Sequence, residues 1–380
     1  MSQSDERSSP IARRRLLELL GAGAGLGSAA WAMGFVPAAL EGTQSSGGAS
    51  APGRGIIRTV LGDIAPDTLT GPTLMHEHLG NGRTDPQATN PTQDTGWMAE
   101  ELTAAKKVGL NCIVAAQTGL PGGEILSYLR QLTEKTGVQI VNAAAHYTAQ
   151  TYPRDVATKT EEQIADDYVE AARVGRLGAF GELGMLNDAA DLDPLERKMF
   201  RAVGKAQART GIPVFTHTNY ATGTHVSMDI ALRQLDALES GGGRTASIAI
   251  GHVCCLDDPM VDVAKRVARR GAFVAFDRVT RQQQWVPDAK KVAMVKALLD
   301  AGLGDRLLLS SDYIGRINTS VGEINAYPGP LHAREGGPGY ARPLVLFVPL
   351  LRKAGVSEAT IRQLTIENPR RFLSFVPAGV

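Results

Sequence analysis

The residues with the clearest chemical potential are histidines and carboxylates that follow short apolar runs of the chain. His76 and His78 close the first such run, 73–78. A spacing of two places both imidazole rings on the same face of a strand. Imidazole and carboxylate groups are the protein ligands expected around zinc and related divalent ions. Later runs end in further residues of these types, namely Glu182, His217, His252 and Asp312.

Each of these residues has another interpretation when it is taken alone. A single His-x-His pair is a weak indication of a metal site, and Glu182 alone could cap a helix or form a salt bridge. Six candidates at the ends of five runs nevertheless favour a metal centre, and one tetrahedral ion binds fewer ligands than that. We therefore expect two divalent ions that share a bridging carboxylate. Zinc is the first expectation, with manganese or cobalt as alternatives.

The elements that must position these residues are eight apolar runs that alternate with stretches of helical periodicity. Continuous apolar runs are typical of strands that are buried on both faces. Between the runs, 194–210 places its apolar residues on one face of a helix, as do 164–174 and 261–268. Repeated units of this kind predict a single (β/α)8 TIM barrel over residues 55–380, with an open doubly wound sheet as the alternative. The runs span 73–78, 111–117, 138–145, 178–183, 213–218, 247–252, 272–277 and 306–312.

In a barrel of this kind the active site gathers at the carboxyl ends of the strands. All six candidate ligands fall at such ends, so the barrel would bring them together at its C-terminal rim. The stretch 357–372 is expected to form a closing helix that is interrupted or bent near 365–369, because Pro369 cannot donate a helical hydrogen bond.

The first 54 residues predict export rather than a part of the barrel. Arg13, Arg14 and Arg15 precede a weakly apolar, glycine-containing stretch in which Glu18 is the only charge. This pattern indicates a twin-arginine signal over 1–40, with a retained membrane anchor as the alternative. The Gly- and Ser-rich stretch 41–54 is expected to be a flexible linker. We expect a periplasmic or secreted protein that has no membrane contact once the signal is removed.

Composition and charge exclude several classes of protein. Hydrophobic residues make up 43% of the chain and charged residues 21%, which is typical of a globular protein. Forty Lys and Arg residues against 39 Asp and Glu give a net charge of +1, so nothing indicates a nucleic-acid partner. Three cysteines are too few for a disulfide scaffold. Cys254 and Cys255 are expected to be reduced thiols rather than a strained vicinal disulfide, and Cys112 is expected to pack in its strand.

Several stretches of the chain match one known family. They are 59–64, 73–78, 211–218, 250–252, 310–312 and 367–372, and with their surroundings they cover nearly everything from 55 to 375. On these stretches the chain resembles the phosphotriesterase family of the amidohydrolase superfamily. The resemblance implies that His76, His78 and Asp312 bind the more buried ion, that His217 and His252 bind the more exposed one, and that the carboxylate at the end of the fourth run bridges both.

The fourth run departs from the best-known members of this family. Their organophosphate hydrolases and lactonases have a carboxylated lysine at the bridging position, whereas this chain has Glu182 between two glycines. The chain therefore resembles the branch called phosphotriesterase homology proteins. A Glu carboxylate provides the same two oxygens and the same charge as a lysine carbamate, and it needs no carbon dioxide to form. This departure favours a carboxyl ester or lactone as substrate over a phosphotriester.

The expected mechanism is hydrolysis by a hydroxide that is shared between the two ions, whose charge lowers the pKa of the water. Asp312 would take up the proton and pass it to the leaving group. The alternatives are a phosphotriesterase that acts on organophosphates and, in another class, a metal-loaded binding protein without turnover. The partner would be a small-molecule ester, lactone or organophosphate, and the resemblance also implies a homodimer.

The residues expected around the substrate are less closely defined. Arg278 follows the seventh run, where an Arg could bind a substrate carboxylate or phosphate, or form a surface salt bridge with Asp277 or a neighbour. Tyr147 follows the third run, where relatives place an aromatic residue against the substrate, although a packing role fits equally well. Cys255 stands where many relatives have an Asp in a proton relay. The Gly- and Pro-rich stretch 318–342 follows the eighth run and should shape substrate choice.

Overall fold

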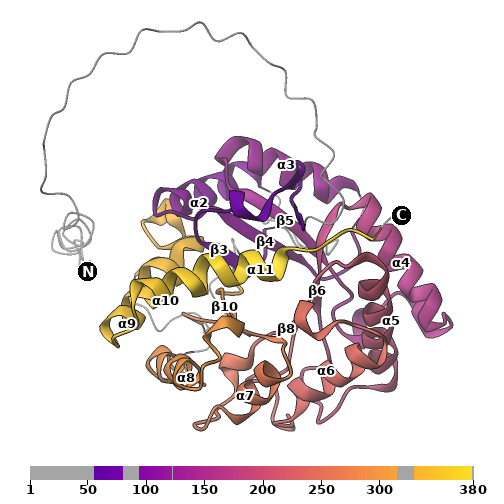
Figure 1. Cartoon of the computed structure of the whole chain (residues 1–380). Coiled ribbons are helices and arrows are strands. Elements are labelled where there is room, and N and C mark those ends of the chain that lie inside the picture. The colour runs from indigo at the N-terminus through magenta and orange to yellow at the C-terminus, as the bar shows by residue number, and fades with distance from the viewer. Residues whose placement is uncertain are drawn as a thin grey trace, which may run out of the picture. The chain divides into compact units, whose positions relative to one another are not determined.

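A computed structural model shows an eight-stranded parallel sheet surrounded by helices (Figure 1). The predicted signal (1–40) and linker (41–54), and the part 318–328 of the predicted site loop, lie outside the residues that are described. Within the described residues, no helix is both long enough and apolar enough to span a membrane. The structure describes residues 55–79, 94–121, 123–281, 283, 285–314 and 329–378.

Every predicted apolar run forms a strand, and neighbouring strands pair in parallel in the order of the chain. All residues of these strands are buried except Gln139, which is half-buried. The strands are covered on both faces, and this explains their continuous apolar sequence. They are β3 (Thr73–Glu77), β4 (Cys112–Gln117), β5 (Gln139–Ala144), β6 (Leu177–Leu183), β7 (Val214–Thr216), β8 (Ile248–Ile250), β9 (Phe273–Phe276) and β10 (Leu307–Leu309).

The sheet closes into the predicted barrel through the segment that follows β10. The backbone N–H of Asp312 donates to the carbonyl of His76 at 3.0 Å, and the N–H of His78 donates to the carbonyl of Tyr313 at 2.9 Å. The buried Glu77 side chain accepts hydrogen bonds from the Ser310 hydroxyl at 2.7 Å and from the N–H of Tyr313 at 2.7 Å. This seam confirms a closed (β/α)8 barrel, and it holds Asp312 beside the histidines of β3.

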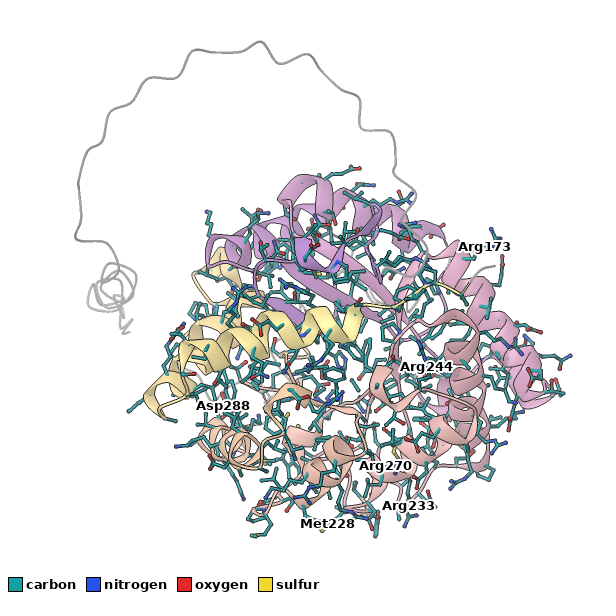
Figure 2. The ribbon with its side chains drawn as sticks, in the orientation of Figure 1. Arg173, Met228, Arg233, Arg244, Arg270 and Asp288 are labelled. Atoms are coloured by element: carbon teal, nitrogen blue, oxygen red, sulfur yellow. The ribbon has the colours of Figure 1, made fainter. Side chains whose placement is uncertain are left out.

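Helices alternate with the strands and form the outer ring, where charged side chains such as Arg233 lie (Figure 2). The predicted helix 194–210 has the same bounds in the structure. It begins at Asp193, which forms a capping box with Glu196, and it ends at Gly211 in the left-handed conformation. The ring consists of α2 (Thr95–Lys107), α3 (Gly123–Thr136), α4 (Glu161–Val174), α5 (Pro194–Thr210), α6 (Ile230–Ser240), α7 (Asp262–Arg269) and α8 (Asp288–Asp300).

The C-terminal helices and an N-terminal hairpin close the amino-terminal end of the barrel. After α9 (Val348–Lys353), the predicted closing helix appears as α10 (Glu358–Arg362), a π-helical turn at Gln363–Glu367 and α11 (Asn368–Leu373). The expected interruption is thus present just before Pro369. The helix α11 lies across one end of the barrel (Figure 1), and it packs against the hairpin of β1 (Ile57–Arg58) and β2 (Asp63–Ile64). Ile57, Met75 and Phe372 belong to one apolar cluster there. This end of the barrel is therefore closed by apolar packing, and the candidate ligands lie at the opposite rim.

Candidate metal centre

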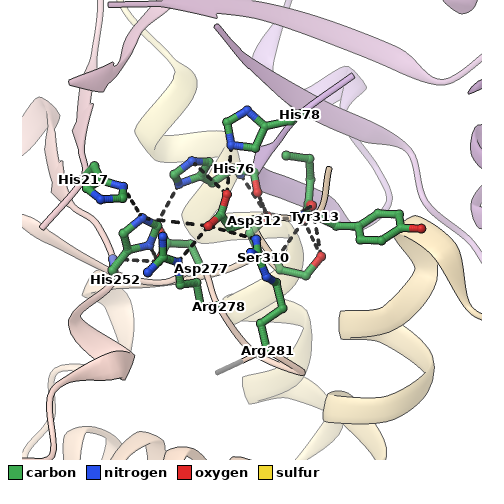
Figure 3. Close-up of polar contacts among 12 residues, drawn as sticks. His76, His78, His217, His252, Asp277, Arg278, Arg281, Ser310, Asp312 and Tyr313 are labelled. Atoms are coloured by element: carbon green, nitrogen blue, oxygen red, sulfur yellow. Dashed lines mark hydrogen bonds and ion pairs between the residues drawn. The ribbon is translucent and has the colours of Figure 1, made fainter. Parts of the chain in front are cut away.

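The six predicted ligands lie together in one buried cluster at the C-terminal rim. Figure 3 shows the five of them other than Glu182, which are His76, His78, His217, His252 and Asp312. The six ligands form two overlapping groups, each with its donor atoms within 4.8 Å of one another, and Glu182 is the member that both groups share. This is the arrangement that two ions with a common bridging carboxylate require. One group is His76, His78, Glu182 and Asp312, and the other is Glu182, His217 and His252.

Glu182 is the penultimate residue of β6 and directs its two oxygens to different histidines. Its Oε1 lies 2.5 Å from His217 Nδ1 and 3.3 Å from His252 Nε2. Its Oε2 lies 3.6 Å from His78 Nε2. Burial disfavours the ionised form, but the charges of His76 and His217 outweigh it and hold the pKa of Glu182 well below its usual range. Glu182 is therefore a carboxylate that faces both groups: Oε2 faces His78 of the first group, and Oε1 lies between His76 of the first group and the histidines of the second.

His76 provides a test of whether the cluster suits a metal ion. Its Nε2 is buried and has no hydrogen-bond partner among the described residues, although Glu182 Oε1 lies 3.4 Å away and Asp312 Oδ1 lies 3.7 Å away. A buried polar atom without a partner costs about 1–3 kcal/mol. A ring nitrogen that faces two carboxylates is a suitable ligand for a divalent cation, so the donor set fits a metal.

Asp277, which directly follows β9, orients two of these histidines and was not assigned from the sequence. Its Oδ2 lies 2.9 Å from Nδ1 of His76, and its Oδ1 lies 3.0 Å from Nδ1 of His252 and accepts the His252 backbone N–H at 2.7 Å. Burial opposes ionisation, yet His252 and His76 together lower the pKa of Asp277. An ionised Asp277 keeps the proton on each Nδ1 and leaves each Nε2 free to bind a metal. Its place as the last residue of the run 272–277 was the available signal.

Two arginines hold Asp312, and one of them corrects an expectation. Arg278 is 6% exposed and donates from Nε to Asp312 Oδ2 at 2.8 Å, so it is neither a surface residue nor the partner of Asp277. Arg281 Nη1 lies 3.0 Å from the same oxygen. Arg281 was not predicted as a site residue, although it stands three residues beyond Arg278 in the same loop. Burial opposes ionisation, but the charges of Arg281 and Arg278 hold the pKa of Asp312 well below its usual range.

Tyr147 lies at the edge of the same cluster. Its hydroxyl is 3.0 Å from His217 Nε2, so the side chain does more than fill space. Burial raises the pKa of Tyr147, which keeps the hydroxyl protonated. The neighbouring His146 instead packs against Tyr168 and does not join the cluster.

The remaining predictions around the centre concern cysteines and the loop after β10. Cys112, Cys254 and Cys255 are buried free thiols, as predicted. Within the described part of the loop, the Tyr340 hydroxyl donates to the carbonyl of His78 at 2.6 Å. The loop thus contacts the rim directly beside a candidate ligand.

Comparisons with known proteins agree with this geometry. The sequence profile of the phosphotriesterase family matches residues 55–373. A phosphotriesterase homology protein from Escherichia coli is 28% identical over 314 residues, spanning 80% of this chain and 98% of the relative. A crystal structure of a protein of that name from Escherichia coli, with phosphate in the active site, is 27% identical and has a TM-score of 0.67, covering 80% of this chain and 99% of its own.

Two further relatives have named activities. An N-acetyltaurine hydrolase from Bos taurus is 27% identical, spanning 84% of this chain and 98% of the relative. An aryldialkylphosphatase from Saccharolobus solfataricus is 25% identical, spanning 80% of this chain and 95% of the relative.

Proposed function

The chain belongs to the phosphotriesterase family of metal-dependent hydrolases, and we propose that it hydrolyses a carboxyl ester or a lactone at a centre for two divalent ions. The observation that supports this most strongly is the pair of donor groups that share Glu182. Zinc suits this mixed set of donors, with manganese and cobalt as alternatives. The proposed ligands are His76, His78 and Asp312 for one ion, His217 and His252 for the other, and Glu182 for both.

The chain's own residues would orient the substrate and move the proton. Divalent ions at such a centre lower the pKa of a water molecule and polarise the substrate oxygen. Arg278 and Arg281 keep Asp312 ionised, which is the form that can take a proton from the attacking water, although their charges also make it a weaker base. The same two charges disfavour the protonated form, and this favours transfer of the proton to the leaving group.

Arg278 and Tyr147 are the proposed substrate contacts. Arg278 Nη1 is buried and has no hydrogen-bond partner among the described residues, so a donor is available for a substrate oxygen. The Tyr147 hydroxyl beside His217 is a second donor near the same cluster. Together they could fix the carbonyl group and one further oxygen of an ester or lactone.

A second candidate is the hydrolysis of an amide whose amine carries an acidic group. Arg278 Nη1, which is buried and has no hydrogen-bond partner among the described residues, would favour such an anion, because a buried polar group of a charged side chain needs a partner. The relative named as an N-acetyltaurine hydrolase supports this candidate. The relative named as an aryldialkylphosphatase keeps phosphotriesters as a third substrate class.

An assay of metal-loaded protein against matched substrates separates these candidates. The panel contains lactones, aryl esters, N-acetyltaurine and paraoxon, each tested with zinc, manganese and cobalt. We expect kcat/KM to be highest for a lactone or an aryl ester. A higher value for N-acetyltaurine or paraoxon would replace the proposed substrate class, and no turnover on an extended panel would favour a binding protein. The Glu182→Ala variant is the control for contaminating hydrolases.

We also propose that the chain is exported through the twin-arginine pathway. Three consecutive arginines before a weakly apolar stretch support this proposal. Replacement of Arg13, Arg14 and Arg15 by Lys should leave the protein in the cytoplasmic fraction, unprocessed. Equal export of the variant and the parent would contradict the twin-arginine assignment.

A further inference from the structure

A fully buried lysine lies beneath the turn that carries the two arginines of the metal centre. Lys291, in the first turn of α8, has no solvent exposure. Its Nζ donates to the carbonyl of Arg278 at 2.7 Å and to the carbonyl of Arg281 at 2.5 Å. Asp288 Oδ1 lies 3.4 Å from the same nitrogen. One ammonium group therefore joins the two ends of the turn 278–281.

Two more buried charged residues hold the middle of this turn. The backbone N–H of Thr280 donates to the Asp288 carboxylate at 3.0 Å, and Asp288 begins α8 (Figure 2). From the other side, Arg342 donates from Nε to the Thr280 hydroxyl at 3.0 Å and from Nη2 to the Thr280 carbonyl at 3.1 Å. Lys291, Asp288 and Arg342 together form what we call the turn clamp.

The turn needs such support because its backbone is strained. Thr280 has φ of +66°, a left-handed conformation that is unfavourable for a β-branched residue. Without partners for its polar groups, the turn would relax toward a common conformation. The side chains at both ends of the turn would then change position, and both of them contact Asp312 Oδ2.

The chemistry of Lys291 is also unusual for a residue with only a structural role. Burial of an ammonium ion is costly unless it is paired and hydrogen-bonded, and an apolar side chain of similar length could fill the same space. Lys296 on the same helix also donates to a carbonyl, that of Ala354, but it is exposed to water. Of these two lysines, only the buried Lys291 donates to the carbonyls of Arg278 and Arg281, whose side chains contact Asp312.

We propose that Lys291 is a positioning residue: with Asp288 and Arg342 it fixes the turn 278–281 and so keeps Arg278 and Arg281 on Asp312. The inference rests on the proposed function to the extent that Asp312 and Arg278 act in hydrolysis. The position of the two guanidinium groups can be measured without any substrate.

The first test is structural and uses Lys291→Met, which keeps an unbranched side chain only one atom shorter and removes its donors. Crystal structures of the metal-loaded parent and variant should show that Arg278 and Arg281 lose hydrogen-bond contact with Asp312 in the variant. Lys296→Met is the matched control on the same helix and should leave both contacts unchanged. If both guanidinium groups stay on Asp312 in Lys291→Met, the inference is wrong.

The second test is kinetic and asks whether Lys291 acts through the arginines. Lys291→Met should lower kcat/KM by about 10- to 100-fold, as small displacements in an active site do, with an unchanged metal content. In the background of Arg278→Gln with Arg281→Gln, the same substitution should change kcat/KM by no more than about twofold, the usual error of such a cycle. A full loss in that background would mean that Lys291 acts by another route and would overturn the inference.

Two further outcomes are also decisive. If Lys291→Met does not fold, Arg342→Lys, which loses the paired contacts with Thr280, takes its place in both tests with the same expectations. If no substrate is turned over by the parent, the proposed function fails, while the crystal structures still decide whether the clamp positions the arginines.

Discussion

Asp312 is the residue at which the proposed proton transfer and metal binding meet. Its Oδ1 faces His78 at 2.9 Å, and its Oδ2 faces the two arginines. Asp312→Asn keeps an oxygen ligand but removes the base, so turnover should fall by about 10²–10⁴, the usual share of general acid–base catalysis. Metal content, measured by elemental analysis, should fall much less.

The control for this prediction is the bridging carboxylate. Glu182→Ala removes an oxygen from both donor groups, so metal and activity should be lost together. Near-normal turnover of Asp312→Asn with a full metal load would show that another group transfers the proton.

Asp277 should affect metal affinity rather than the chemical step. Its two oxygens face Nδ1 of His76 and of His252, and loss of such an outer partner typically weakens metal binding about 10- to 100-fold. Competition with a chelator should show this loss for Asp277→Asn. Asp258→Asn is a matched control, because Asp258 is also buried but accepts the N–H groups of Met260 and Val263. Equal affinities for the two variants would contradict the role of Asp277.

At the scale of elements, local patterns were enough to predict the strands and α5. The strands are covered on both faces, so their apolar runs are continuous, and α5 begins and ends at local signals, Asp193 and Gly211. The outer partners of the ligands were not predictable in the same way. Asp277 and His76 are 201 residues apart, and their contact arises only once the barrel has closed. The same holds for Glu77. In the sequence it is only one of several polar residues in the run 73–78, yet in the structure it connects β3 to the segment that follows β10.

The contact between α2 and the segment after β10 should make stability depend on pH. Glu101 in α2 is 1% exposed and accepts the N–H of Ala333 at 2.8 Å. Burial raises the pKa of Glu101 from 4.5 to about 7. The folded chain then binds a proton that the unfolded chain has released, so stability falls as the pH rises from 4.5 through about 7.

Glu101→Gln tests this dependence, since the amide keeps an acceptor oxygen and does not titrate. The free energy of unfolding is measured by denaturant titration at pH 5 and at pH 8 with saturating metal. Its decrease from pH 5 to pH 8 should be larger for the parent than for the variant. Changes that come from the metal centre cancel in this comparison. Equal falls for the two proteins would show that Glu101 is already ionised at pH 5.

At the scale of the whole molecule, the two ends of the barrel differ in the residues that they bury. The hairpin β1–β2 and α11 close one end with apolar contacts, whereas the opposite rim gathers the ionisable residues. This division is typical of (β/α)8 enzymes, and it explains how so many charged groups can be buried without disrupting the main core. The predicted homodimer and export stay predictions for the full chain.

The protein should assemble its centre from metal alone, because the proposed bridging carboxylate belongs to the encoded side chain of Glu182. Metal-free protein that is dialysed against zinc, manganese or cobalt in bicarbonate-free buffer should bind about two ions per chain, as a bridged hydrolase centre requires. Activity should return in proportion to the second ion bound, and added bicarbonate should change neither the metal content nor the rate. A carbamate bridge would need carbon dioxide at this step. A strict requirement for bicarbonate would therefore exclude Glu182 as the bridge and point to a lysine that enters the centre in its place.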